Sequence, residues 1–165
     1  MAQNHSQATR EEDAGLDLRN LLALDHARLD QLFETLNAAF EGDARPDIPR
    51  IWTMFEAELQ QHFALEEKLI IPEFAKVAPA EAAALLRDHA ELRSRLSSLG
   101  VGVDLHLTRA EAVSGFVRTL RSHAKREDAL LYRWAQTHLA EHTQAKLRSN
   151  LLGSVQEFLG IGRAT

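Results

Sequence analysis

Apolar residues recur every three or four positions along most of the chain, a spacing that predicts amphipathic helices. These stretches cover about 18–40, 48–76, 80–100, 109–138 and 139–159. Polar segments with glycine or proline separate several of them, and Pro72 should kink or loosen the end of the second helix. Four long amphipathic helices with short connections predict an all-α, up-down-up-down four-helix bundle, followed by a short extra C-terminal helix.

The length of the chain fits one domain with a substantial core. We expect residues 1–16 to form a flexible N-terminal tail, because they are polar and show no helical apolar period. We expect residues 17–165 to form the domain, including the C-terminal helix. The third helix should stop near Gly100. It would then be nearly one turn too short after His89 for His123 of the fourth helix to lie at the same depth in the bundle. Either the loop after it climbs, or the helix continues past Gly100.

The four apolar stripes are interrupted by polar side chains at the positions where leucines would otherwise continue. Each long helix directs at least one histidine inward, and two helices add a glutamate four residues later, one turn along the same face. These inward polar residues, in chain order, are His26, His62, Glu66, His89, His123 and Glu127.

A single histidine on an apolar helix face is usually a hydrogen-bonded core residue, so His26 or His89 alone would point to nothing more. The set is harder to explain in that way. A buried carboxylate without a partner costs on the order of several kcal/mol, and no lysine or arginine occupies the inward positions next to Glu66 and Glu127. A bound cation between the helices would balance these charges.

An internal repeat supports a shared site. The segment Asp-His-Ala-x-Leu occurs at Asp25–Leu29 and again at Asp88–Leu92. The segments HFALEEKLIIP and HAKREDALLYR share His-x-x-x-Glu followed by a second acid and an apolar pair. Two helical hairpins, each giving one histidine and one His-x-x-x-Glu, would form a pseudo-symmetric cage.

Composition narrows the function further. The chain has no cysteine, which excludes thiolate metal sites and cysteine nucleophiles. The formal net charge of -5 argues against nucleic acid or an anionic membrane surface as partner. No apolar run approaches the ~20 residues that a membrane span needs, and no signal sequence is visible. We therefore expect a cytoplasmic protein.

The pattern His, His-x-x-x-Glu, His, His-x-x-x-Glu across four helices resembles the hemerythrin-like family, also called the HHE cation-binding domain, over residues 18–136. Ferritin-like bundles are the rival, but their Glu-x-x-His spacing is missing here. The residue three before each of the last three core histidines is a leucine, namely Leu59, Leu86 and Leu120.

The resemblance implies a site for two iron ions. His26 and His62 would bind one, His89 and His123 the other, and Glu66 and Glu127 would bridge them together with an oxo or hydroxo group. Asp128 is a second candidate for the bridge from the fourth helix. Imidazole and carboxylate ligands also suit manganese or zinc, so the preference for iron comes from the resemblance.

The resemblance further implies that the centre binds oxygen, nitric oxide or peroxide, for sensing, detoxification or iron handling. The alternative is a di-iron oxidase or peroxidase-like enzyme, and a third possibility is a module whose metal stabilises the fold. Oxygen carriers of the family have another histidine four residues after the third-helix ligand. Arg93 stands there, so reversible oxygen carriage is not expected. Arg93 either folds away from the site or pairs with a carboxylate such as Asp88 or Glu127.

Other polar residues allow ordinary explanations. Asp25 and Asp88 either orient ligands from outside the centre or are exposed helix charges. Glu67 lies ~100° away from the ligand stripe and should matter far less than Glu66. His138 and His142 have a spacing that can hold a metal, but a solvated surface is the simpler interpretation.

Overall fold

The computed structural model describes residues 17–42 and 47–158, with side chains through residue 154. The expected tail at residues 1–16 lies outside the described residues. The described chain is helical and contains no strand, so the expected all-α class is confirmed. Its helices are α2 (Leu18–Glu41), α3 (Ile48–Leu69), α4 (Ile71–Phe74), α5 (Pro79–Asp104), α6 (Ala110–Ala129), α7 (Leu131–His138) and α8 (Glu141–Phe158).

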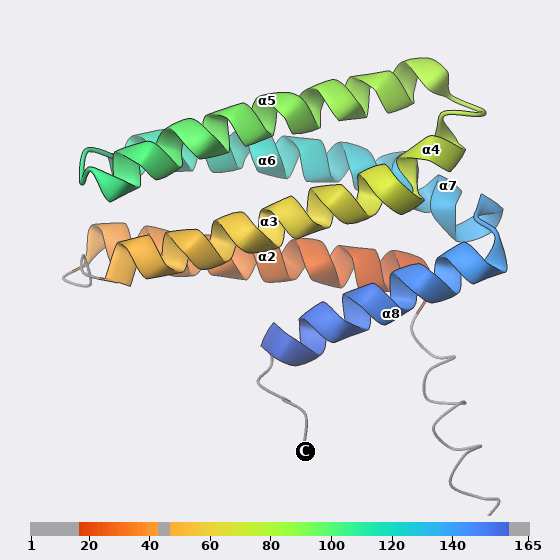
Figure 1. The fold of residues 1–165 in the computed structure, drawn as a ribbon, viewed down its shortest axis with the longest axis horizontal. Coiled ribbons are helices and arrows are strands. Elements are labelled where there is room, and N and C mark those ends of the chain that lie inside the picture. Colours follow the sequence, from red (N-terminus) through yellow and green to blue (C-terminus); the bar gives the residue numbers. More distant parts are fainter. Residues whose placement is uncertain (1–16, 43–46, 159–165) are drawn as a thin grey trace, which may run out of the picture.

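The four long helices α2, α3, α5 and α6 lie side by side and form the body of the molecule (Figure 1). Helix α2 contacts α3 and α6, and α5 contacts the same two helices from the other side. The short helices α4 and α7 contact each other and extend α3 and α6 at one end. Helix α8 returns along the bundle and packs against α2 and α3.

Two of the expected helices are interrupted. The second helix does not run unbroken to residue 76, because α3 ends at Leu69 and α4 begins at Ile71. Pro72 explains this break, since it has no N–H and its ring opposes the carbonyl of Lys68. The fourth helix is also interrupted, at Leu130, where no proline or glycine marks the break.

The third helix, α5, does not stop at Gly100 but continues to Asp104. Continuation of the helix, the second of the two alternatives, therefore supplies the missing turn. Gly100 has a local packing reason: a Cβ there would lie 3.0 Å from Nε1 of Trp52. The glycine lets α5 approach α3 closely at this level, and it does not act as a helix end.

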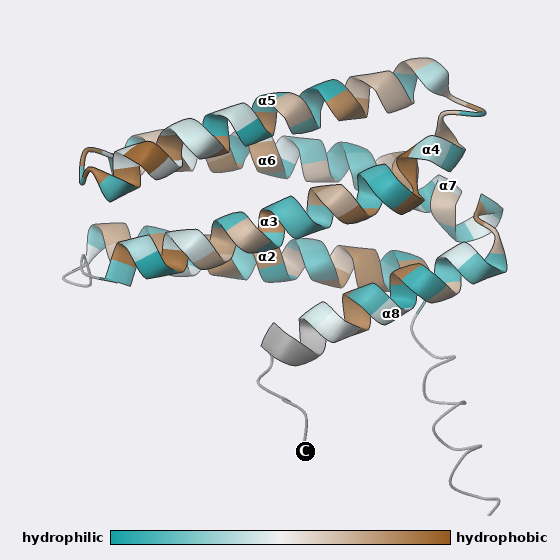
Figure 2. Cartoon of the chain, viewed as in Figure 1, coloured by the Kyte–Doolittle hydropathy of each residue, from teal (hydrophilic) through white to brown (hydrophobic). Residues whose placement is uncertain are grey.

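The core consists of two apolar clusters. One cluster includes Leu29 and Phe63, and the other includes Leu22 and Tyr132. Along α2 and α5, the residue between the two clusters is a histidine, His26 and His89 respectively. Figure 2 shows teal polar segments interrupting the brown apolar ones along the long helices. A polar layer therefore lies between two apolar cores, each buried leucine of which contributes about 1.5–3 kcal/mol.

None of the helices in the described part of the chain combines the length and apolarity needed to cross a membrane.

Candidate metal centre

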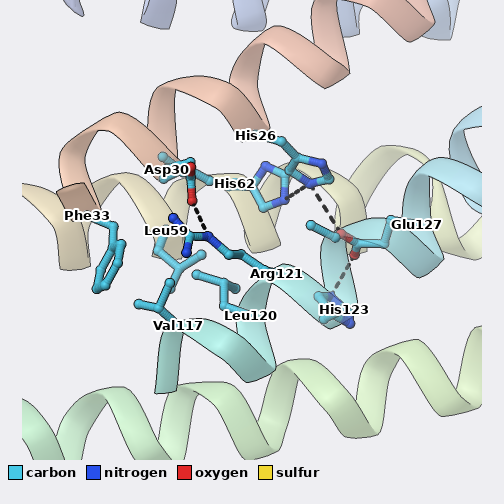
Figure 3. A pocket seen from close by; sticks show the side chains of 12 residues that line it. His26, Asp30, Phe33, Leu59, His62, Val117, Leu120, Arg121, His123 and Glu127 are labelled. Carbon is cyan, nitrogen blue, oxygen red and sulfur yellow. Dashed lines mark hydrogen bonds and ion pairs between the residues drawn. The ribbon is translucent and has the colours of Figure 1, made fainter. Parts of the chain in front are cut away.

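The six predicted residues converge in the polar layer between the two apolar clusters. The Nε2 atoms of His26 and His62 lie 3.3 Å apart. Glu127 Oε1 lies 3.1 Å from His89 Nε2 and 2.7 Å from His123 Nε2. Figure 3 shows His26, His62, His123 and Glu127 pointing toward one another from α2, α3 and α6.

These donor atoms fall into two groups that could each hold a metal ion. The first is His26, His62, Glu66 and Glu127, and the second is His89, His123 and Glu127. The two groups separate the histidines as α2/α3 and α5/α6 pairs. They also share Glu127, so a single carboxylate belongs to both.

The two glutamates each reach histidines of both pairs. Glu127 Oε2 lies 3.3 Å from His26 Nε2, while its other oxygen faces His89 and His123. Glu66 Oε2 lies 3.6 Å from His62 Nε2 and 3.4 Å from His89 Nε2. Glu127, with one oxygen toward each histidine pair, is suited to bridging two cations, whereas Glu66 contacts both pairs through a single oxygen.

The charges of this layer fit a metal ion. Glu66 and Glu127 are 0% exposed, and neither contacts a lysine or arginine in the described residues. Several donor atoms at the centre of the cluster also have no hydrogen-bond partner, namely Glu66 Oε2, His123 Nε2 and Glu127 Oε2. Two buried carboxylates without a cation would be strongly destabilising, so the residues present require bound protons or metal ions.

Protons fill this role when no metal is bound. Burial alone would lower the pKa of His26, but the carboxylates of Asp128 and Glu127 outweigh it and raise the pKa to about 10. His89 is also desolvated, yet Glu127 and Glu66 raise its pKa to about 10. Burial would raise the pKa of Glu127, but the imidazoles of His123, His26 and His89 that face its carboxylate hold it well below its usual value. Metal ions would therefore displace protons from this cluster.

A carboxylate faces the outer nitrogen of each of the four histidines. The Nδ1 atom contacts one carboxylate oxygen in every case, so the inner Nε2 atom is left to face the centre. The four pairs and their distances are His62–Asp25 at 2.8 Å, His89–Glu67 at 2.9 Å, His123–Asp88 at 3.4 Å and His26–Asp128 at 3.4 Å.

Arginines hold three of these four outer carboxylates in place. Arg28 donates to Asp25 at 2.8 Å, and Arg126 donates to Asp88 at 2.6 Å. Arg93 donates to both oxygens of Glu67, at 2.5 and 3.1 Å. Arg93 therefore pairs with a carboxylate, one of the two expected alternatives, but this carboxylate is Glu67 and neither Asp88 nor Glu127.

Two acidic residues beside the ligands have positions that differ from the simplest expectation. Glu67 points away from the centre, as its rotation along the helix requires. It nevertheless contacts Nδ1 of His89, so it has a role beside the site and is not simply an exposed charge. Asp128 lies at the outer nitrogen of His26, with its side chain 42% exposed. Glu127, and not Asp128, occupies the middle of the cluster.

Sequence reasoning missed one residue, Tyr132. Its hydroxyl donates to Glu66 Oε1 and lies 3.0 Å from His26 Nε2, and the residue is 0% exposed. Burial and the nearby Glu66 charge raise the pKa of the phenol well above its ordinary value in this arrangement. The only signal in the sequence was a tyrosine within the apolar run that follows Glu127.

A cavity of about 40 Å³ reaches the centre between α2, α3 and α6. Its lining is mainly apolar and includes Leu29, Phe33, Leu59 and Val117, with His26, His62, His123 and Glu127 at the centre (Figure 3). Arg121 also lines the cavity and is held by Asp30 at 2.6 Å. The space admits a molecule of a few atoms next to the metal-binding groups.

The remaining histidines do not join the centre. His138 and His142 are exposed, and their ring nitrogens contact Thr137, Thr143 and the carbonyl of Trp134. Neither belongs to a metal-binding group in the described part of the chain. His5 lies outside the described residues.

The family model of the hemerythrin HHE cation-binding domain matches residues 17–135. Since this match covers most of the chain, the protein belongs to that family, and the resemblance seen in its motifs is confirmed. The match ends within α7, so α8 lies beyond it. No curated protein and no solved structure matches the chain.

Proposed function

We propose that this protein is a non-haem di-iron protein whose centre binds a small molecule. One iron would be held by His26 and His62 and the other by His89 and His123. Glu66 and Glu127 would bridge them, within an up-down-up-down bundle of α2, α3, α5 and α6. The observation that carries this proposal is the pair of buried glutamates among four histidines, which no lysine or arginine of the described residues contacts.

The surrounding residues have two tasks in this proposal. The outer carboxylates keep hydrogen on Nδ1, which fixes the orientation of each imidazole and leaves Nε2 free to donate. The apolar clusters on either side exclude water, which strengthens electrostatic interactions within the layer. When bound, iron supplies redox chemistry and open positions for an added ligand.

The cavity favours oxygen, nitric oxide or peroxide as the molecule that binds. Its volume of about 40 Å³ suits only a few atoms, and its apolar walls suit molecules with little charge. Sensing, detoxification and iron handling all remain compatible with such a ligand. A cytoplasmic setting without a nucleic-acid or membrane partner goes with this proposal.

Iron analysis tests the binuclear centre. Reconstituted protein should approach two irons per chain, and the variant His142→Ala should do the same, because this exposed histidine serves as the matched control. A saturating ratio of one or none would contradict the proposal. Manganese and zinc loading under the same conditions would show whether the preference is for iron.

Mixing the reduced protein with oxygen or peroxide separates the two candidate functions. Arg93 is paired with Glu67 and has no lone pair for a metal, so the centre has four histidines. We expect the diferrous protein to oxidise in air without holding oxygen reversibly, and to bind azide or nitric oxide readily. Repeated turnover of peroxide would favour the enzyme; release of oxygen under vacuum with return of the diferrous spectrum would contradict our expectation.

A further inference from the structure

Tyr132 is the only tyrosine in the chain, and its hydroxyl lies inside the candidate metal centre. The side chain begins at the second residue of α7, directly after the break at Leu130. It reaches the α2/α3 side of the centre, where its oxygen meets Glu66 and His26. Both recorded partners of this hydroxyl are therefore proposed metal ligands.

The spacing of the tyrosine oxygen matches that of the other donor atoms. It lies 3.0 Å from His26 Nε2, while the two ligand nitrogens His26 Nε2 and His62 Nε2 lie 3.3 Å apart. Two donors bound to one metal at about 2.0–2.2 Å, roughly at right angles, lie about 3 Å from each other. The phenolic oxygen is thus placed as a neighbour of His26 around a common ion.

Packing does not explain the hydroxyl. The tyrosine ring belongs to the apolar cluster that includes Leu22 and Leu131, and a phenylalanine ring would occupy the same volume. The oxygen instead adds a polar group to a layer that already holds two buried carboxylates, and its hydrogen bond to Glu66 and its contact with His26 offset the cost of burying it. A metal ion among these groups would take the place of the hydroxyl proton, and hard oxygen donors suit ferric iron as carboxylates do.

We propose that the phenolic oxygen of Tyr132 is a further ligand of the metal ion held by His26 and His62. This inference rests on the proposed di-iron centre. On ligation the phenol loses its proton to solvent and the oxygen forms a bond to the metal, with no change of oxidation state. The two metal positions then differ, because the α2/α3 position has an added anionic oxygen and the α5/α6 position does not.

The difference determines where an added molecule binds. With Tyr132 as a ligand, the α2/α3 position has one fewer place for an exogenous ligand. The cavity is lined by His26 and His62 as well as by His123, so it gives access to both positions. The additional open place at the ion held by His89 and His123 should therefore direct azide or nitric oxide to that ion.

The optical and resonance Raman spectra of the iron-loaded, oxidised protein test this inference. Ligation by Tyr132 should give a broad visible absorption band from phenolate-to-iron charge transfer, together with resonance-enhanced phenolate ring vibrations. Tyr132→Phe should lose both while it retains the same iron content. Because no other tyrosine exists in the chain, the signal has one source.

Labelling the unaltered protein with ring-deuterated tyrosine removes any dependence on how the variant folds. The resonance-enhanced bands should then shift in frequency. Wild-type protein that holds two irons but shows no phenolate vibrations would overturn this inference alone. Wild-type protein that holds no iron would overturn the proposed function and this inference with it.

Discussion

The two helical hairpins carry the same short motif in different surroundings. In the first hairpin, Asp25 contacts His62 at 2.8 Å and its side chain is 3% exposed. In the second, Asp88 contacts His123 at 3.4 Å and its side chain is 36% exposed. Each aspartate precedes a site histidine on its own helix and contacts the site histidine of the other helix in its hairpin.

Helix α8 accounts for this difference. It packs on α2 and α3 and buries Leu147 and Leu151, whereas in the described chain no corresponding helix packs on α5 and α6. Arg28, which holds Asp25, is buried, while Arg126, which holds Asp88, is a third exposed. The shared motif therefore lies in a buried charge network on one side and a solvent-screened one on the other. Its variable position also differs, because it is Arg28, the partner of Asp25, in the first copy and the exposed Glu91 in the second.

The largest expected effect concerns the glutamate that the two halves share. Glu127 directs one oxygen to His26 and the other to His89 and His123, so Glu127→Ala should lose most iron from both positions. His26→Ala should retain about one iron per chain, because the second group does not include it. Iron analysis after reconstitution measures both. Loss of only one iron from Glu127→Ala would show that the halves bind metal independently.

Removing the repeated aspartate should affect stability unequally. Asp25→Ala should lower the free energy of unfolding by about 3–5 kcal/mol, because it breaks a buried pair and leaves Arg28 with less compensation. Asp88→Ala should cost about 0–1 kcal/mol, because water screens its pair with Arg126. Denaturant unfolding of the metal-free proteins measures both. Equal losses would remove the distinction drawn between the hairpins.

The pH dependence of the metal-free protein should involve both halves. His26 on α2 and His89 on α5 each have a folded-state pKa raised to about 10 from an ordinary value of 6.5. Their stabilisation is complete below about pH 6.5 and is lost as the pH rises toward 10. Denaturant midpoints at pH 6, 8 and 10 should fall in that order. The midpoint of the iron-loaded protein should fall less over this pH range, since metal replaces the protons. Midpoints that rise with pH would refute the raised pKa values of His26 and His89.

The smallest effect should come from the outer arginine of the second hairpin. Arg93→Ala frees Glu67 from its paired hydrogen bonds and so loosens the orientation of His89. We expect metal affinity to fall about tenfold, the lower range for such outer partners. Competition with a chromophoric chelator measures this. Arg95→Ala is the matched control, because Arg95 pairs with the exposed Glu91, and an equal loss there would exclude a specific role for Arg93.

The helical class and the residues of the polar layer could be predicted from the spacing of apolar and polar residues along the chain. Period-3.6 apolar stripes require helices that bury one face, and a histidine or glutamate in register with leucines is carried to the same depth by that periodicity. Local stereochemistry also predicted the break near Pro72. These features depend only on the spacing of residues within one helix, and this spacing can be read directly from the sequence.

The side-chain partners across helices could not be predicted in the same way, because they depend on how the helices pack. Arg93 pairs with Glu67 and not with Asp88 or Glu127, because the rotation of α5 against α3 sets which side chains meet. Tyr132 reaches Glu66 because the break at Leu130 redirects α7. That break could not be predicted from the sequence, since no proline or glycine marks it. The unequal burial of Asp25 and Asp88 goes with the packing of α8 on α2 and α3, and α8 lies far along the chain from either copy of the repeated motif.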